Sequence, residues 1–122
     1  MARILIIDDL QEMRATIRDF LVGSKFESVE ASNGAAALKL IEVGAPDLIV
    51  TDILMPEMEG IETIREVRRN HPRIKIIAMS GGRSAEMDFL DVAQKLGADR
   101  VLAKPFSQGQ LLDLVQELLA PA

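Results

Sequence analysis

The sequence predicts an α/β protein built on a doubly wound, five-stranded parallel sheet. Short apolar runs alternate with segments that carry apolar residues at helical spacing, and the alternation repeats five times along the 122 residues. Strands that alternate with helices pair in parallel through right-handed crossovers, which place helices on both faces of the sheet. The first, third and fourth runs are nearly all apolar and the second is mixed. We therefore expect the strand order 2-1-3-4-5, with the second strand at an edge.

Turn and cap residues set the expected boundaries in the first half of the chain. Met13, Ile17 and Leu21 share one helical face, and Gly23 ends that helix. Asn33 is suited to cap the next helix, because its side chain accepts a backbone N–H. The expected elements are a strand at 3–7, a helix at 10–22, a strand at 26–31, a helix after residue 33 and a strand at 47–51.

Similar signals mark the second half of the chain. Gly97 closes one expected helix, and Ser107 is suited to cap the last one. Arg65, Arg68 and Arg69 are expected on the solvated side of their helix. The expected elements are a helix at 60–70, a strand at 74–79, a helix within 84–96, a strand at 100–103 and a helix after residue 107.

Composition is that of an ordinary globular domain and excludes several functions. The chain is 48% hydrophobic and 27% charged, and 122 residues suffice for one core, so we expect a single domain over 1–122. A net charge of −5 without a Lys/Arg cluster argues against direct nucleic-acid binding. The lack of cysteine excludes disulfides, thiolate metal sites and cysteine nucleophiles. With no long apolar run and no signal-peptide pattern, we expect a cytoplasmic protein without membrane contact.

Polar side chains follow four of the expected strands, each directly after its apolar run. In an open parallel sheet, ligands bind beyond the carboxyl ends of the strands where the strand order reverses, here between the first and third strands. We therefore expect these side chains to share one pocket. They are Asp8 and Asp9 after the first strand, Asp52 after the third, Ser80 with Gly81 and Gly82 after the fourth, and Lys104 after the fifth.

The residue types in this expected pocket suit phosphoryl transfer. Three carboxylates repel each other unless a cation lies among them, and Mg²⁺ is the best candidate because it binds one or two carboxylates and contacts a phosphate oxygen. Lys104 adds a second positive charge for the same phosphate, and Ser80 adds a hydroxyl donor. Nucleophile, metal, cation and hydroxyl are the parts that transfer to an aspartate requires.

Other functions of an aspartate behind a parallel strand fit less well. A haloacid-dehalogenase-type phosphatase needs a second aspartate two residues after the first, but that position is Leu54. A flavodoxin-like electron carrier needs a phosphate-cradling loop after the first strand, where Asp8 and Asp9 would repel the phosphate. A dinucleotide site needs a G-x-G-x-x-G motif there, which the chain lacks. Taken singly, Asp8 or Asp9 also has an ordinary structural role as a helix cap.

Four short motifs carry a family resemblance. They are Asp8-Asp9, the stretch Asp52-Ile53-Leu54-Met55-Pro56-Glu57-Met58-Glu59-Gly60, Ser80-Gly81 and Lys104-Pro105-Phe106. Over nearly its whole length, the chain resembles the receiver domain of two-component response regulators. The resemblance implies a flavodoxin-like (βα)5 fold and a phosphoprotein of phosphorelay signal transduction.

The resemblance also assigns a metal site. It implies that Asp52 is the phosphoacceptor, which forms a 4-aspartylphosphate. It further implies that Asp9, Asp52 and the backbone carbonyl of Leu54 bind Mg²⁺ directly, while Asp8 acts mainly through a metal-bound water.

The same resemblance implies roles around the phosphoryl group. Lys104 would pair with that group and with Asp52, and Ser80 would donate a hydrogen bond to it. The Lys104–Pro105 peptide would be cis. The donor would be a phosphohistidine on a sensor histidine kinase or a histidine phosphotransfer protein, and phosphorylation would switch binding of a downstream protein. Such a domain is a switch that catalyses its own phosphorylation and slow dephosphorylation, not an enzyme with a separate substrate.

Departures from the family pattern concern the output of the switch. Val101 stands where the family usually has Tyr or Phe, which couples the site to the face of the fourth helix, fifth strand and fifth helix. The spacing between the serine and lysine motifs is longer than usual, so we expect the loop at 81–84 to carry the conformational signal. Leu54 and Gly82 cannot hold or activate a water, so we expect no fast self-dephosphorylation.

Three roles are open within this resemblance. The chain is a stand-alone output switch, a shuttle in a phosphorelay, or a domain of a larger regulator or hybrid kinase. Homodimerisation through the fourth helix, fifth strand and fifth helix is open as well.

Overall fold

The computed structural model describes residues 2–53, 59–80, 91, 94–95 and 97–120. Its five parallel strands form one sheet in the order β2-β1-β3-β4-β5, which confirms the predicted topology. The strands are β1 (Arg3–Ile7), β2 (Glu27–Ala31), β3 (Leu48–Asp52), β4 (Lys75–Ser80) and β5 (Arg100–Ala103). The helices are α1 (Gln11–Leu21), α2 (Gly34–Val43), α3 (Glu59–Asn70) and α5 (Gln108–Leu119).

The predicted element boundaries agree with these bounds to within one residue. The helix expected within 84–96 falls largely outside the described residues, of which only 91 and 94–95 belong to that range. Among the helices that the structure describes, none is long and apolar enough to cross a bilayer.

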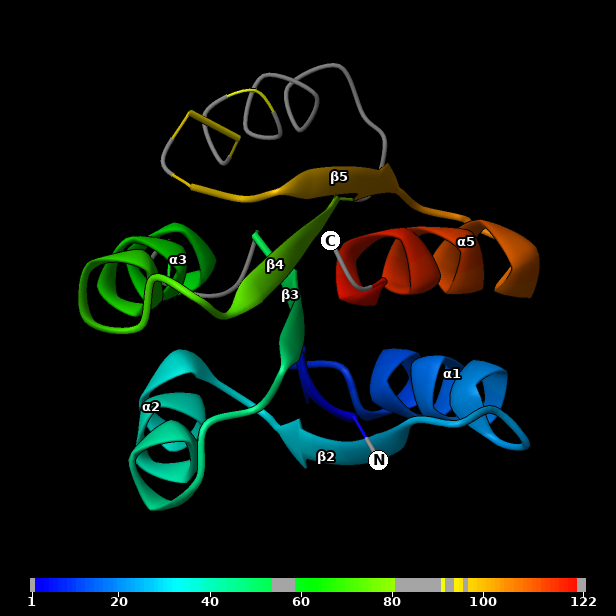
Figure 1. The fold of residues 1–122 in the computed structure, drawn as a ribbon, viewed down its shortest axis with the longest axis horizontal. Coiled ribbons are helices and arrows are strands. Elements are labelled where there is room, and N and C mark those ends of the chain that lie inside the picture. The colour runs from blue at the N-terminus through cyan, green and yellow to red at the C-terminus, as the bar shows by residue number, and fades with distance from the viewer. Residues whose placement is uncertain (1, 54–58, 81–90, 92–93, 96, 121–122) are drawn as a thin grey trace.

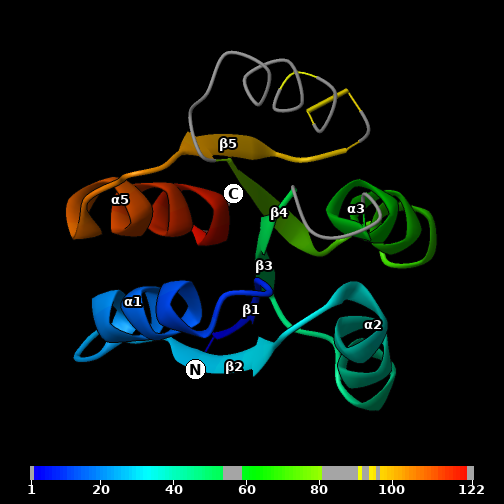
Figure 2. The same ribbon diagram turned by 180° about the vertical axis from the view of Figure 1, so that it is seen from behind.

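Two helical layers cover the two faces of the sheet. Helices α1 and α5 lie side by side on one face, and α2 and α3 lie on the other (Figures 1 and 2). Because side chains alternate along a strand, Ile4 and Ile6 of β1 pack towards α1 and α5, while Leu5 and Ile7 pack towards α2 and α3. Each face therefore has its own apolar core, and the central strands are buried on both sides.

The register of the sheet aligns the carboxyl ends of the strands. Ile7 pairs with Thr51 across β1 and β3, and Asp52 pairs with Met79 across β3 and β4. Ser80 pairs in turn with the last residue of β5. The residues at and directly after these positions therefore meet at one edge of the sheet.

Side-chain caps begin two of the helices, as the sequence predicts. The Asn33 carboxamide oxygen accepts the Ala36 N–H at 2.8 Å at the start of α2. Ser107 and Gln110 form a reciprocal capping box at the start of α5. Gly23 follows α1 with φ of 83°, a conformation that glycine adopts without a steric penalty.

The predicted exposure of the α3 arginines is correct for Arg65 and Arg69, which are exposed, and wrong for Arg68. The Arg68 side chain is 26% exposed and pairs with Asp99 at 2.9 Å. It also donates to the carbonyl of Gly97 at 2.7 Å. Helical periodicity predicts on which face of the helix a residue lies. It does not predict that the segment around Gly97 packs against the last turn, so the sequence could not reveal these contacts.

Candidate functional site

Three aspartates meet at the carboxyl edge of the sheet, where the sequence predicts a pocket. Carboxylate oxygens of Asp8, Asp9 and Asp52 all lie within 4.8 Å of one another. Asp8 is fully buried and Asp52 is 5% exposed, whereas Asp9 is exposed. The cluster therefore has a buried pair at its base and one carboxylate that solvent can reach.

Lys104 links the two buried carboxylates. Its ammonium nitrogen lies 3.2 Å from Asp8 Oδ2 and 3.5 Å from Asp52 Oδ2, and its side chain is only 14% exposed. Buried charges require such partners, because the loss of hydration is otherwise uncompensated. The lysine leaves the cluster of three carboxylates with a formal charge of −2, which one divalent cation balances.

Ser80 contributes a buried hydroxyl at the same edge. Its residue is 0% exposed, and within the described part of the chain its Oγ has no hydrogen-bond partner. Its backbone carbonyl accepts the Lys104 N–H at 2.6 Å, which ties the end of β4 to the end of β5. A buried hydroxyl without a partner costs free energy, and a ligand bound at this edge would supply the missing hydrogen bond.

The donor set fits a hard divalent cation. Carboxylate oxygens are the ligands that Mg²⁺ prefers, and an exposed carboxylate beside two buried ones leaves room for the waters that Mg²⁺ retains. A soft transition metal fits poorly, because the three residues offer oxygen ligands only.

Gly60, which ends the motif that begins with Asp52, lies so close to the end of β3 that it has no room for a side chain. A Cβ on Gly60 would lie 2.3 Å from the carbonyl oxygen of Asp52 and 2.6 Å from Cα of Ile53. Both atoms belong to the backbone and cannot move aside, so only glycine permits α3 to start this close to the end of β3. The sequence showed the glycine in the motif but not this contact, which depends on the path of the loop.

Arg14 was not predicted as a site residue. Its guanidinium donates from Nη1 to the backbone carbonyl of Asp8 at 2.7 Å, and from Nε to Glu30 at 3.3 Å. The available signal was its position one turn into a helix, because helical side chains lean back towards the preceding turn.

Several predictions for the site fall outside the described residues. They concern the Leu54 carbonyl as a metal ligand, the loop at 81–84 as the signalling segment, and the effect of Leu54 and Gly82 on dephosphorylation. The predicted cis peptide at Lys104–Pro105 is present. Val101 is half-buried and packs against the core on the α2–α3 side of the sheet.

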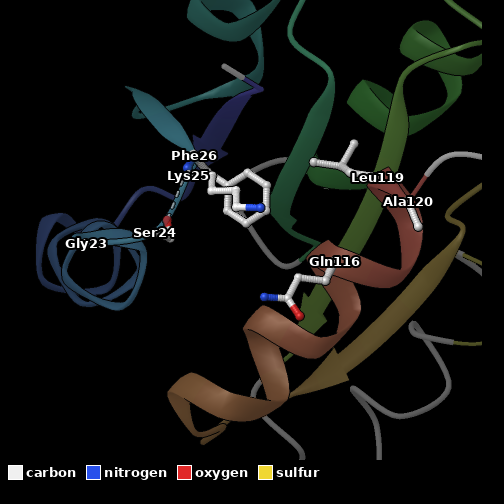
Figure 3. Close-up of a pocket in the computed structure, with 7 residues that line it drawn as sticks. All are labelled: Gly23, Ser24, Lys25, Phe26, Gln116, Leu119 and Ala120. Carbon is white, nitrogen blue, oxygen red and sulfur yellow. Dashed lines mark hydrogen bonds between the residues drawn. The ribbon is translucent and has the colours of Figure 1, made fainter.

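A groove of about 550 Å³ lies away from this cluster. Its walls are the segment from Gly23 to Phe26 and the end of α5 near Leu119 (Figure 3). Both segments lie at the amino edge of the sheet, because α1 ends there and β2 begins there. Within the first wall, the Phe26 N–H donates a hydrogen bond to Ser24 Oγ (Figure 3). None of the residues that line the groove is acidic. The groove is therefore separate from the acidic site.

An open parallel sheet with a lysine-bridged carboxylate cluster at its switch point defines a class of protein, the α/β domains that bind their ligand beyond the strand ends, here with a donor set suited to a divalent cation. The chain belongs to the response regulator receiver domain family, whose family model matches residues 4–116. Receiver domains of this family are phosphoryl-accepting switches that bind Mg²⁺ through an acidic pocket, and Asp8, Asp9 and Asp52 form such a group here.

Individual relatives agree with this assignment. The chain is 39% identical over 120 residues to chemotaxis protein CheY of Bacillus subtilis, covering 96% of this chain and 97% of that protein. It is 30% identical to sporulation initiation phosphotransferase F of Bacillus subtilis, covering 96% and 93% of the two chains. The structure of chemotaxis response regulator CheY4 of Vibrio cholerae matches with a TM-score of 0.86 at 29% identity, covering 98% and 99%. Longer proteins also match, and the chain spans 27% of the NtrX chain from Brucella abortus.

Proposed function

We propose that Asp52 accepts a phosphoryl group in a Mg²⁺-dependent reaction, and that phosphorylation changes the affinity of the chain for a downstream protein. The observation that supports this most directly is the position of Lys104 between the carboxylates of Asp8 and Asp52. The two carboxylates need a cation to be buried together, and the same cation is available to a phosphoryl oxygen beside Asp52.

The donor in this proposal is a phosphohistidine of a sensor histidine kinase or of a histidine phosphotransfer protein. A carboxylate oxygen of Asp52 attacks the phosphorus, the phosphorus–nitrogen bond breaks, and the histidine nitrogen takes back the electron pair and then a proton. The product is an acyl phosphate on Asp52 and a free histidine. The transfer involves no change of oxidation state and needs no further reactant.

Each nearby side chain has a distinct role. Asp9 and Asp52 would hold Mg²⁺ directly, with the Leu54 carbonyl as a further proposed ligand, and Asp8 would act mainly through a metal-bound water. The ion would offset the charge of the attacking carboxylate and of the phosphoryl oxygens. Lys104 pairs with a phosphoryl oxygen, and the Ser80 hydroxyl gains the hydrogen bond that it lacks among the described residues.

The similarity to a chemotaxis protein favours the role of an output switch for this receiver domain, which we propose to span 1–122. The chain covers 97% of the chemotaxis protein and 93% of the sporulation phosphotransferase from Bacillus subtilis. The second of these names favours a phosphorelay shuttle as an alternative role. A domain of a larger regulator is the third role, and it fits the longer matches. A cytoplasmic location, and a homodimer through the face of the expected fourth helix, β5 and α5, stay predictions.

The phosphoacceptor assignment is tested by incubating the protein with acetyl phosphate and Mg²⁺ and measuring its intact mass. We expect the wild type to gain one phosphoryl group, and Asp52→Asn to gain none. Asp47→Asn is the matched control, because Asp47 lies just before β3 at the opposite edge, where its carboxylate accepts the Arg3 N–H at 2.8 Å. A wild type that gains no mass, or an Asp52→Asn variant that gains as much as the wild type, would contradict the proposal.

Transfer from the phosphorylated chain to a histidine phosphotransfer protein distinguishes a switch from a shuttle. A shuttle passes its phosphoryl group on to the histidine, whereas an output switch keeps it and binds a protein target. A pull-down with beryllofluoride and Mg²⁺, compared between wild type and Asp52→Asn, identifies that target.

A further inference from the structure

We infer that Arg14 positions the turn between β1 and α1, which carries Asp9, and thereby sets the Mg²⁺ affinity of the site. This inference rests on the proposed function, since it concerns the same acidic cluster. It adds a positioning residue that lies on α1 and contributes no ligand itself.

The Arg14 side chain is anchored at both ends of its guanidinium. Nη1 donates to the Asp8 carbonyl at 2.7 Å, while Nε lies 3.3 Å from Oε1 of Glu30 on β2. The arginine side chain is only 16% exposed. A guanidinium held by a neighbouring strand in this way is pre-organised to fix the carbonyl that it contacts.

The polar atoms of Asp8 show what this contact holds. The Asp8 N–H donates to the Ala31 carbonyl at 3.2 Å, and its Oδ1 accepts the Leu10 N–H at 2.9 Å. Its Oδ2 lies 3.2 Å from the Lys104 ammonium, so the remaining acceptor is the backbone carbonyl that Arg14 contacts. This carbonyl belongs to the peptide that joins Asp8 to Asp9, so its orientation determines where the Asp9 backbone begins.

Asp9 depends on that orientation more than its neighbours do. It is exposed, and no ion pair involves it within the described ranges, whereas Asp8 and Asp52 share Lys104. Repulsion from the two buried carboxylates favours an Asp9 side chain that turns away from the cluster. A fixed backbone opposes this, and keeps the third carboxylate within 4.8 Å of the others.

The charge of Arg14 and its positioning effect predict opposite results. A positive charge near a cation site weakens cation binding, so removing a cation that acts through charge alone would tighten Mg²⁺ binding. Removing a positioning residue would weaken binding, because residues that orient metal ligands typically contribute about 10-fold or more to metal affinity. The sign of the change therefore identifies the role.

Arg18 offers a matched control one turn further along α1. It pairs with the other carboxylate oxygen of Glu30 at 3.0 Å, and its side chain is 48% exposed. Among the described contacts it makes none with Asp8. Its removal changes the net charge by the same amount and breaks a salt bridge to the same residue, but leaves the Asp8 carbonyl untouched.

The test is a Mg²⁺ titration by isothermal titration calorimetry on wild type, Arg14→Met and Arg18→Met. Methionine keeps the apolar stem of the arginine and removes all donors. We expect Arg14→Met to bind Mg²⁺ about 10-fold more weakly than the wild type, and Arg18→Met to stay within about twofold. Equal or tighter binding by Arg14→Met, or the same loss in both variants, would overturn the inference.

Two additions keep the test decisive if Arg14→Met folds poorly. Arg14→Lys keeps the charge and one flexible donor, and its affinity should fall between those of Arg14→Met and the wild type. In the Mg²⁺-free proteins, the Leu10 amide should exchange faster in both Arg14 variants than in Arg18→Met, and equal rates would count against the inference. A wild type that binds no Mg²⁺ would instead refute the proposed function, so the two failures are distinguishable.

Discussion

At the residue scale, the negative charges of the three clustered aspartates are only partly balanced by a cation. Lys104 contacts Asp8 and Asp52, and no ion pair to Asp9 exists among the described residues. The three carboxylates nevertheless lie within 4.8 Å of one another. Like charges at such a distance destabilise a fold. Asp9 therefore makes the cation-free protein less stable while it helps the site to bind a cation.

We therefore predict that Asp9→Asn stabilises the Mg²⁺-free protein. Removing one charge from the cluster should raise the free energy of unfolding by about 1 kcal/mol, the size of the Coulomb repulsion between two solvated unit charges about 4 Å apart. Urea denaturation without Mg²⁺ measures this. Asp113→Asn on the exposed side of α5 is the control, with an expected change within about 0.5 kcal/mol. An Asp9→Asn variant that is less stable than the wild type would show that repulsion is not the dominant effect.

Gly60 gives a second prediction at this scale. In Gly60→Ala the new Cβ would lie 2.3 Å from the Asp52 carbonyl oxygen, so α3 or the end of β3 must shift. We expect the free energy of unfolding to fall by about 2 kcal/mol or more, as for other steric insertions into packed backbone. The same shift moves the backbone of Asp52, so Mg²⁺ binding should weaken as well.

Gly109 is the matched control for Gly60, because it is also a helical glycine and its Cβ would meet only Ser107 Oγ at 3.9 Å. Gly109→Ala should stabilise the protein by about 0.5–1 kcal/mol, since alanine has the higher helix propensity. Both variants are compared by urea denaturation. Similar stability changes in the two variants would mean that the close approach at Gly60 is tolerated.

At the element scale, the sequence predicts which segments form strands and helices, and does so to within one residue. Apolar runs such as 3–7 and stripes such as Met13 and Ile17 are local signals, so periodicity suffices to read them. It also predicts that Asp52 and Lys104 meet, because parallel strands end at a common edge.

Contacts between a helix and a loop outside it could not be predicted from the sequence. Arg68 was expected to face solvent, and its actual partners near Gly97 lie 29 positions along the chain. Arg14 reaches back to the Asp8 carbonyl, whose orientation depends on the path of the turn. Helical spacing specifies a direction for such side chains, while the backbone groups that they meet are set by tertiary packing.

Arg68 ties three elements together at the amino edge of the sheet. Its Nη1 donates to the carbonyls of Pro72 and Ile74, and its Nη2 donates to the carbonyl of Gly97. Its ion-pair partner Asp99 also accepts the Ile76 N–H at 2.8 Å, at the start of β4. The end of α3, the start of β4 and the segment before β5 therefore share one side chain.

We predict that Arg68→Ala lowers the free energy of unfolding by about 2 kcal/mol, because several carbonyls and one carboxylate lose a charged donor that is largely shielded from solvent. Arg69→Ala, at an exposed neighbouring position, should change it by no more than about 0.5 kcal/mol. Urea denaturation with a shared slope distinguishes the two. Equal losses would show that Arg68 contributes only as a surface charge.

At the scale of the whole molecule, the site is built from the carboxyl ends of four of the five strands. Asp8 follows β1, Asp52 ends β3, Ser80 ends β4 and Lys104 follows β5. A ligand that binds these residues together can exist only in the folded chain, because the four segments are far apart in sequence. Ligand binding and global stability must therefore be linked.

This linkage yields the last prediction, that Mg²⁺ raises the melting temperature of the protein. At a Mg²⁺ concentration of about ten times the dissociation constant, the free energy of unfolding should rise by about 1.4 kcal/mol. For a domain of this size, that corresponds to about 5 °C. Asp52→Asn should lose most of the shift, because a ligand of the cluster is neutralised, whereas Asp47→Asn at the opposite edge should keep it. A melting temperature that does not depend on Mg²⁺ would mean that the acidic cluster does not bind the ion, and an equal shift in both variants would mean that Mg²⁺ binds elsewhere on the molecule.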